Sequence, residues 1–236
     1  EYQVFLDSDK QLEIFFQPLD FWNTQEDIFP LSGKPNSKII MGNENGYYAY
    51  IFSDNYGFRN PNNVWKKNKT KYLLIGDSFA HGYAVNKPND ISSQLRNLSK
   101  ENVINLGFSS NGPLQSYATL KEFFPNNVEN ILWFFFEGND LRELNLEKKN
   151  KILLEYFKDD FYSQNLTLRE KEIKKILGDY SKKQLKILAN KEKRQNRFIK
   201  FIMLWNLRSK AHYFAANIGV KKDLILTNNF NLYLDI

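Results

Sequence analysis

Residues 72–85 read YLLIGDSFAHGYAV, and this stretch decides the fold class. A short apolar run ends on Gly76 and is followed at once by Asp77 and Ser78. Runs of this length are typical of parallel strands that are buried on both faces. Two similar runs follow along the chain, ENVINLG at 101–107 and NILWFFFEG at 130–138. The sequence therefore predicts a parallel sheet of at least three strands.

Two helix patterns lie between these strands. Residues 89–99 read NDISSQLRNLS, with Asn89 or Asp90 as the candidate N-cap, and residues 113–124 read PLQSYATLKEFF, with Pro113 at the first helical position. The alternation of strand and helix predicts an α/β fold, a doubly wound parallel sheet with right-handed crossovers.

The flanking segments have a different character. We expect irregular chain over 1–36 and a β-hairpin over 38–58, because two β-prone runs flank Asn45 and Gly46. Helical spacing of apolar residues over 143–218 predicts a helical insertion, with a lid or a partner surface as its hypothetical role. The expected organisation is an N-terminal segment over 1–69, packed on an α/β domain over 70–236.

Composition excludes some classes of protein. The chain has no cysteine, which excludes disulfides and thiolate metal sites. Its 33 Lys and Arg exceed its 27 Asp and Glu, and all of the excess lies after residue 140. Solvated helix faces explain this excess better than a nucleic-acid or membrane-surface site, because the aromatic residues there have core spacing. No apolar run approaches the roughly 20 residues that span a bilayer. The first residue, Glu1, favours an N-terminal signal or anchor that was removed or left out.

The residues at the predicted strand ends suit acyl chemistry. In an open α/β sheet, ligands bind beyond the carboxyl ends of the strands. The hydroxyl of Ser78 would be exposed there at the start of a helix, as a nucleophile. The backbone N–H of Gly107 and the side-chain amide of Asn139 would reach the same edge. Together with the N–H of Ser78 they would stabilise an oxyanion, which is what ester hydrolysis needs.

In the residues at these strand ends, the chain resembles the SGNH (GDSL-type) hydrolase superfamily. The motifs are GDSF at Ser78, NLG at Gly107 and GND at Asn139, within about residues 54–140. The resemblance implies a flavodoxin-like sheet, Ser78 as nucleophile, these three residues as oxyanion donors, and neither metal nor organic cofactor. The lead-in SDNYGFRNP also resembles bacterial SGNH-like proteins that are exported or membrane-associated and linked to cell-surface polysaccharides, which implies a periplasmic or membrane-associated location.

Further residues receive supporting roles. The resemblance implies that Asp77, with Gly76, holds the nucleophile turn. Asp140 is expected to cap the helix that follows it. The expected substrate pocket is lined by residues near the strand ends, namely His81, Ser109, Asn111 and Glu137.

The chain departs from the family in its third block and in its histidine. Glu137 stands where the block usually has glycine, and the family's Asp-x-x-His block is missing. His81 is too close to Ser78 in sequence to act as its base, and His212 is expected to pack in a helix. We expect the block to follow Ile236 in a longer natural chain, in preference to a natural pseudoenzyme.

The predicted function is a serine esterase or deacylase that acts on O-acyl esters, with O-acetyl groups on carbohydrates as the favoured substrate. Two alternatives stay open. An O-acyltransferase for cell-surface polysaccharide would use the same strand ends with a sugar hydroxyl in place of water. A catalytically inactive SGNH-like protein would bind carbohydrate in the same cleft.

Overall fold

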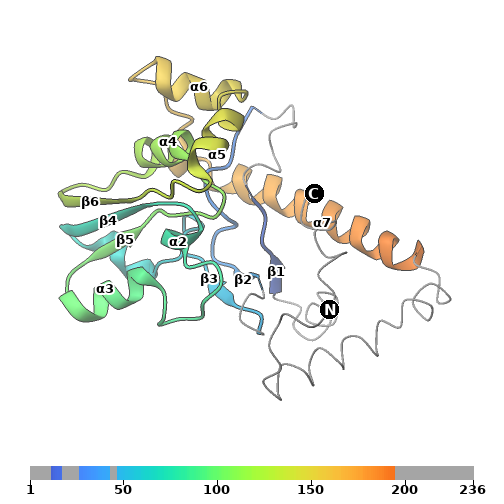
Figure 1. Ribbon diagram of the computed structural model, residues 1–236, viewed down its shortest axis with the longest axis horizontal. Coiled ribbons are helices and arrows are strands. Elements are labelled where there is room, and N and C mark those ends of the chain that lie inside the picture. Colours follow the sequence, from blue (N-terminus) through green and yellow to red (C-terminus); the bar gives the residue numbers. More distant parts are fainter. Residues whose placement is uncertain (1–11, 18–26, 43–46, 195–236) are drawn as a thin grey trace. The chain divides into compact units, whose positions relative to one another are not determined.

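A computed structural model describes residues 12–17, 27–42 and 47–194 of the chain (Figure 1). Contacts divide the chain into one unit over 1–182 and a second over 183–236. The described residues of the second unit, 183–194, belong to helix α7 (Glu170–Arg194). The site and the pocket analysed below both lie in the first unit.

A parallel sheet forms the centre of the first unit. Its strands are β4 (Thr70–Gly76), β5 (Val103–Asn105) and β6 (Val128–Phe134), in the order β5-β4-β6. Leu74 of β4 pairs with Asn105 on one side and with Leu132 on the other. The fold is thus mixed α/β with a parallel sheet, as the three apolar runs predict.

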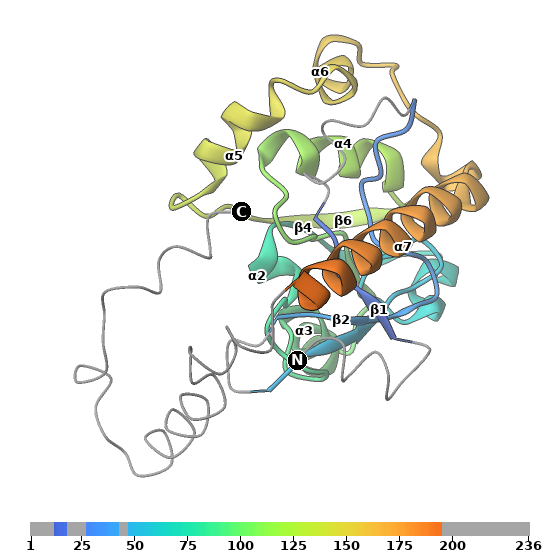
Figure 2. The same ribbon diagram turned by 90° about the vertical axis from the view of Figure 1, so that its right-hand side faces the viewer.

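Helices connect these strands. The short helix α2 (Ser78–His81) follows β4, α3 (Ile91–Ser99) precedes β5, and α4 (Pro113–Phe123) precedes β6. Asp90 is the N-cap of α3, since its carboxylate accepts a 2.9 Å bond from the N–H of Ser93. Figures 1 and 2 show α4 and α3 on opposite sides of the sheet.

A second sheet precedes the first. Strands β2 (Lys38–Ile40) and β3 (Tyr50–Phe52) are antiparallel, which confirms the predicted pairing, although the Asn45–Gly46 turn lies outside the described residues. The expectation of irregular chain over 1–36 is wrong in one place. Strand β1 (Leu12–Ile14) pairs in parallel with β2, a long-range pairing without a local sequence signal. A 3-10 helix, η2 (Asn62–Lys66), then leads to β4.

The residues after β6 are helical. Helices α5 (Asp140–Glu147) and α6 (Lys151–Lys158), the 3-10 turn η3 (Leu166–Leu168) and α7 follow in order. None of the helices that the structure describes combines the length and apolarity needed to cross a membrane.

The larger of two buried apolar clusters joins the three regions of the first unit. Phe29 from the N-terminal segment, Leu73 and Ile104 from the sheet, and Tyr156 and Ile173 from the later helices belong to the same buried cluster. The described part of the predicted insertion therefore contributes to this core, which includes residues on both sides of position 69. A second, smaller buried cluster lies in and beside the second sheet and contains Ile39 and Ile51.

Strand β6 differs from its expected burial. Ile131 and Trp133 of this strand, and Phe135 directly after it, are each about half exposed, where the apolar run predicts burial on both faces. Among the described elements, β4 is the strand that pairs with β6. Helices α2 and α4 contact β4 and α3 contacts β5, and no described helix makes a comparable contact with β6.

Candidate active site

The nucleophile turn begins at Gly76. Its φ of +140° is one that side chains rarely allow, and an added Cβ would lie 2.5 Å from the carbonyl oxygen of Phe134. Asp77 then caps α2, accepting a 3.0 Å bond from the N–H of Phe79. Ser78, the first residue of α2, is half-buried, and its N–H bonds to no residue in the described ranges. The turn thus presents a serine hydroxyl beside an open backbone donor.

Gly107 brings the end of β5 against α2. A Cβ added to Gly107 would lie 2.4 Å from the Cβ of Ala80, so only glycine permits this approach. Its N–H donates to Asn105 Oδ1 over 2.8 Å and is not free for a substrate oxygen. The same Asn105 donates its Nδ2 to the carbonyl oxygen of Ala80 over 2.6 Å. In this structure Gly107 therefore serves packing, and its expected role as an oxyanion donor requires the bond to Asn105 to open.

Asn139 brings the third strand end to the nucleophile turn. Its Nδ2 donates to Glu143 Oε1 over 2.9 Å and lies 3.5 Å from Asp77 Oδ2. Asn139 is also the residue that precedes α5, and it forms no side-chain cap there. The amide proposed as an oxyanion donor is therefore held between two carboxylates.

Asp140 and Glu143 form a buried acidic pair beside Asn139. Asp140 does not cap α5 as expected; it is the first residue of that helix, and its Oδ2 accepts a 2.8 Å bond from the N–H of Phe136. Burial raises the pKa of both carboxyls, and Asp77 adds to the rise. No arginine or lysine in the described ranges forms an ion pair with either acid. This environment favours their neutral forms.

His81 does not line a cleft, contrary to expectation, because its side chain is fully buried. Its Nδ1 accepts from the hydroxyl of Ser109 at 2.9 Å and from the N–H of Ser109 at 3.2 Å, which leaves the ring proton on Nε2. The ring stacks on Phe108 at a centroid distance of 4.7 Å. Burial, with nearby Arg59, lowers the pKa of His81 to about 3. His81 is therefore a neutral packing residue and cannot take the proton of Ser78.

Two other expected pocket residues are buried as well. Ser109 is hydrogen-bonded to His81. Asn111 is 1% exposed, and neither the oxygen nor the nitrogen of its side-chain amide has a hydrogen-bond partner among the described residues. Glu137 is exposed at the end of β6. His212 lies outside the described residues.

The motif SDNYGFRNP is connected to the nucleophile helix by hydrogen bonds, a role that the sequence did not indicate. The carboxylate of Asp54 accepts from the N–H of Phe58, the amide of Asn60 and the indole of Trp65, at 2.8 to 2.9 Å. Burial raises the pKa of Asp54, and these bonds oppose the rise. Asn60 Oδ1 in turn accepts from the N–H of Asn105 over 2.8 Å. A chain of buried amides thus connects the motif to the nucleophile helix.

Arg59, in the same motif, holds the segment after α2. Its guanidinium donates to the carbonyl oxygens of Gly82 and Val85 and lies 3.3 Å from Asp90 Oδ2. Burial lowers the pKa of Arg59, and the carboxylate of Asp90 opposes that shift. The segment that follows α2 is therefore fixed by Arg59.

An apolar surface adjoins the nucleophile. The ring of Phe79, 57% exposed, meets that of Phe136 edge to face at a centroid distance of 5.3 Å. Leu141 at the start of α5 is also exposed. Exposed aromatic rings directly after Ser78 and at the end of β6 can receive an apolar group of a ligand.

No group of His, Cys, Asp or Glu within the described ranges is arranged to hold a metal ion. Comparisons of the chain with protein-family models, with curated proteins and with solved structures gave no match.

Proposed function

We propose that this chain is a serine esterase or deacylase for O-acyl esters, built on a doubly wound core of the SGNH type. The observation that carries the proposal is the meeting of strand ends around Ser78. The amide of Asn139 lies 3.5 Å from the carboxylate of Asp77, the residue that precedes the nucleophile. A hydroxyl at a helix start, with an open N–H and a nearby amide, is suited to acyl transfer.

The reaction would proceed through an acyl-serine. The Ser78 hydroxyl attacks the carbonyl carbon of the ester and passes its proton to a base. The resulting oxyanion accepts hydrogen bonds from the N–H of Ser78 and from Nδ2 of Asn139. Collapse of this intermediate, with transfer of the proton from the base to the leaving oxygen, releases the alcohol. Water then gives a proton to the base and attacks the acyl-serine, which releases the carboxylic acid and, with return of that proton, regenerates the hydroxyl. The exposed rings of Phe79 and Phe136 offer a surface for the acyl group.

The general base belongs to a residue outside the described ranges. His81 is excluded because its accepting nitrogen is already bonded to Ser109 and its pKa is lowered to about 3. The carboxylates near Ser78 already accept other hydrogen bonds, Asp77 from the N–H of Phe79 and Glu143 from the amide of Asn139. The proposed substrates are acetyl or other short acyl esters of carbohydrates, with a periplasmic or membrane-associated setting.

A second candidate is a binding protein that retains the fold without catalysis. The observation that favours it is the occupation of two expected oxyanion donors. The N–H of Gly107 is bonded to Asn105, and the amide of Asn139 is bonded to Glu143. Such a protein would bind carbohydrate at the strand ends and would not react.

Covalent labelling separates these candidates. A fluorophosphonate probe forms a stable bond to an activated serine, and the modified residue is identified by mass spectrometry of peptides. We expect the label on Ser78 in the wild-type protein, its loss in Ser78→Ala, and its retention in Ser99→Ala. Ser99 is a suitable control because it ends α3, where its hydroxyl bonds the carbonyl oxygen of Leu95. If Ser78 is not labelled, or is labelled no more than other serines, the result contradicts the esterase and supports the binding protein.

A further inference from the structure

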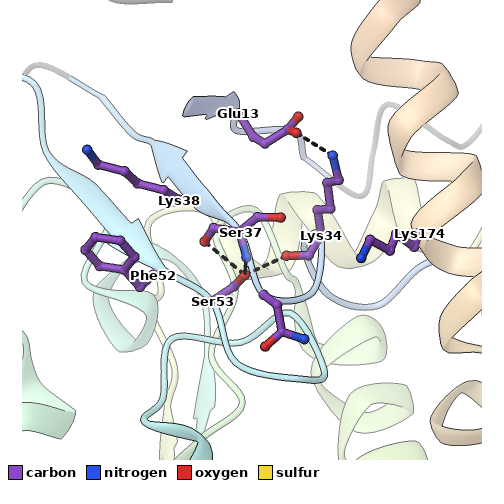
Figure 3. A pocket seen from close by; sticks show the side chains of 8 residues that line it. Glu13, Lys34, Ser37, Lys38, Phe52, Ser53 and Lys174 are labelled. Atoms are coloured by element: carbon purple, nitrogen blue, oxygen red, sulfur yellow. Dashed lines mark hydrogen bonds and ion pairs between the residues drawn. The ribbon is translucent and has the colours of Figure 1, made fainter. Parts of the chain in front are cut away.

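The polar groups of two regions differ in how far their hydrogen bonds are satisfied. One region is a pocket of about 540 Å³ between the second sheet and α7 (Figure 3). There the carboxylate of Glu13 pairs with Lys34, and the hydroxyl of Ser53 donates to the carbonyl oxygen of Lys34 over 2.6 Å. The other region is the strand ends, where Oδ1 of Asn139 and Oε2 of Glu143 are buried without a hydrogen-bond partner among the described residues. The polar groups with bonding capacity to spare therefore include these two residues beside the nucleophile turn.

The side-chain amide of Asn139 has two N–H groups, and they have different surroundings. Its Nδ2 donates to Glu143 Oε1 over 2.9 Å, an ordinary length for a hydrogen bond. The distance from the same nitrogen to Asp77 Oδ2 is 3.5 Å, at the limit of a hydrogen bond. One N–H is therefore held by Glu143. The other lies on the side of the nucleophile turn, in a weak contact that a stronger acceptor can replace.

Glu143 is itself held in place. It is 6% exposed on α5 and follows Asn139 by four residues, about one helical turn. One turn further along, the carboxylate of Glu147 accepts from the N–H groups of Gly112 and Leu114 over 2.7 and 2.9 Å, which anchors α5 to the start of α4. Burial raises the pKa of Glu143, but a carboxyl oxygen can accept from Asn139 in either protonation state. The acceptor for Asn139 is therefore in position before a substrate binds.

We propose that Glu143 is a positioning residue for the reaction at Ser78, because it holds one N–H of Asn139 so that the other N–H faces the oxyanion. This inference rests on the proposed esterase activity. During the attack, the second N–H exchanges its long contact with Asp77 for a charge-assisted bond to the oxyanion, which is shorter and stronger. An amide that is oriented in advance stabilises the transition state better than one that must first turn. The bond from Asn139 to Glu143 thus prepares the oxyanion donor and does not block it.

Two substitutions separate the hydrogen bond from the packing of the side chain. Glu143→Gln keeps an oxygen that can accept from Asn139, whereas Glu143→Met has a similar length without a comparable acceptor. The rates are measured on the full chain with p-nitrophenyl acetate. We expect Glu143→Met to lower kcat by about tenfold with little change in KM, a fraction of the roughly 100-fold or greater loss when an oxyanion donor is removed. Glu143→Gln should be clearly faster than Glu143→Met.

A double-mutant cycle with Asn139 shows whether Glu143 acts through that amide. In the Asn139→Ala background, Glu143→Met should cause no further loss of kcat, because the amide that it positions is gone. Glu147→Gln is the control, since it changes a buried acid of the same helix that bonds α4 and has no bond to Asn139. Its effect on kcat should be the same factor in both backgrounds. Thermal unfolding of each variant checks that it is folded.

The outcomes separate this inference from the proposed function. If Ser78→Ala hydrolyses the ester as fast as wild type, the proposed function fails and the positioning role fails with it. If hydrolysis depends on Ser78 but Glu143→Met is as fast as Glu143→Gln, or its loss multiplies with that of Asn139→Ala, the positioning role alone is overturned. Glu143→Gln also decides the matter by itself, should Glu143→Met not fold. A loss in Glu143→Gln as large as that in Asn139→Ala overturns the role, and a rate well above that of Asn139→Ala supports it.

Discussion

The side-chain amide of Asn105 donates to the carbonyl oxygen of Ala80 over 2.6 Å, so the last residue of β5 holds the helix that begins with the proposed nucleophile. The same side chain accepts from the N–H of Gly107 over 2.8 Å. Asn105 is fully buried, and its backbone N–H is bonded to Asn60. One asparagine therefore connects the second strand end, the nucleophile helix and the motif at 53–61.

Replacing Asn105 should destabilise the fold. Asn105→Ala leaves the carbonyl of Ala80 and the N–H of Gly107 without their partner, and each unsatisfied buried group costs about 1–3 kcal/mol. We expect the free energy of unfolding to fall by about 2–4 kcal/mol in urea denaturation. Asn130→Ala is the matched control, because it removes an exposed amide bond to the carbonyl oxygen of Lys71. Equal stability of the two variants would contradict the bracing role of Asn105.

Gly107 and Gly178 should respond to alanine in opposite directions. At Gly107 the new Cβ would lie 2.4 Å from that of Ala80, so Gly107→Ala forces β5 and α2 apart. We expect a loss of at least about 2 kcal/mol of stability from this overpacking. Gly178 lies within α7 with no atom within 4 Å of an added Cβ, and Gly178→Ala should stabilise the protein by about 0.5–1 kcal/mol. Thermal unfolding of both variants measures the difference, and a tolerated Gly107→Ala would show that the approach is not tight.

Glu143 should make stability fall as the pH rises. Its folded pKa is raised, chiefly by burial, so the stabilisation of the protonated form is present at acidic pH and lost as the pH rises through the folded pKa. Glu143→Gln imitates the protonated form and keeps an oxygen that can accept from Asn139. We expect this variant to be more stable than wild type at pH 8 and to lose that advantage near pH 4. Glu155→Gln, on the exposed surface of α6, should show no such crossover. A pH-independent effect of Glu143→Gln would contradict the assignment.

His81 should make stability fall as the pH is lowered, which is the opposite pH dependence. Its folded pKa of about 3 lies below the ordinary value of 6.5, so between these values the unfolded chain binds a proton that the folded chain does not. Stability therefore falls as the pH is lowered through this window, by at most about 1.4 kcal/mol per pH unit. His81→Gln keeps an acceptor for Ser109 and should lose less stability than wild type between pH 7 and pH 5. Identical pH slopes in urea denaturation would show that His81 titrates normally.

The sequence was sufficient for the parallel sheet and its helices because their signals are local. The apolar run before Gly76, the Asp90 cap and Pro113 at the first turn of α4 each predict structure from a few neighbouring residues. The pairing of β1 with β2 was missed, because Leu12 and its partner Lys38 are distant in sequence and carry no mutual signal.

The roles of the site residues were less predictable. The sequence indicated that Ser78 and Asn139 would come to one edge, and the bond between Asn139 and Asp77 places their strand ends together. It did not indicate that Asn105 would occupy the N–H of Gly107, or that His81 would be buried against Phe108. Such hydrogen bonds depend on side-chain directions that only the packed structure defines.

The most direct test of the central claim is the rate of p-nitrophenyl acetate hydrolysis by wild type, Ser78→Ala and Ser99→Ala. The account predicts turnover by wild type and by Ser99→Ala, and a fall to the uncatalysed rate in Ser78→Ala, with unchanged thermal unfolding of all three proteins. Hydrolysis that is equal in wild type and Ser78→Ala would contradict a serine esterase mechanism at Ser78.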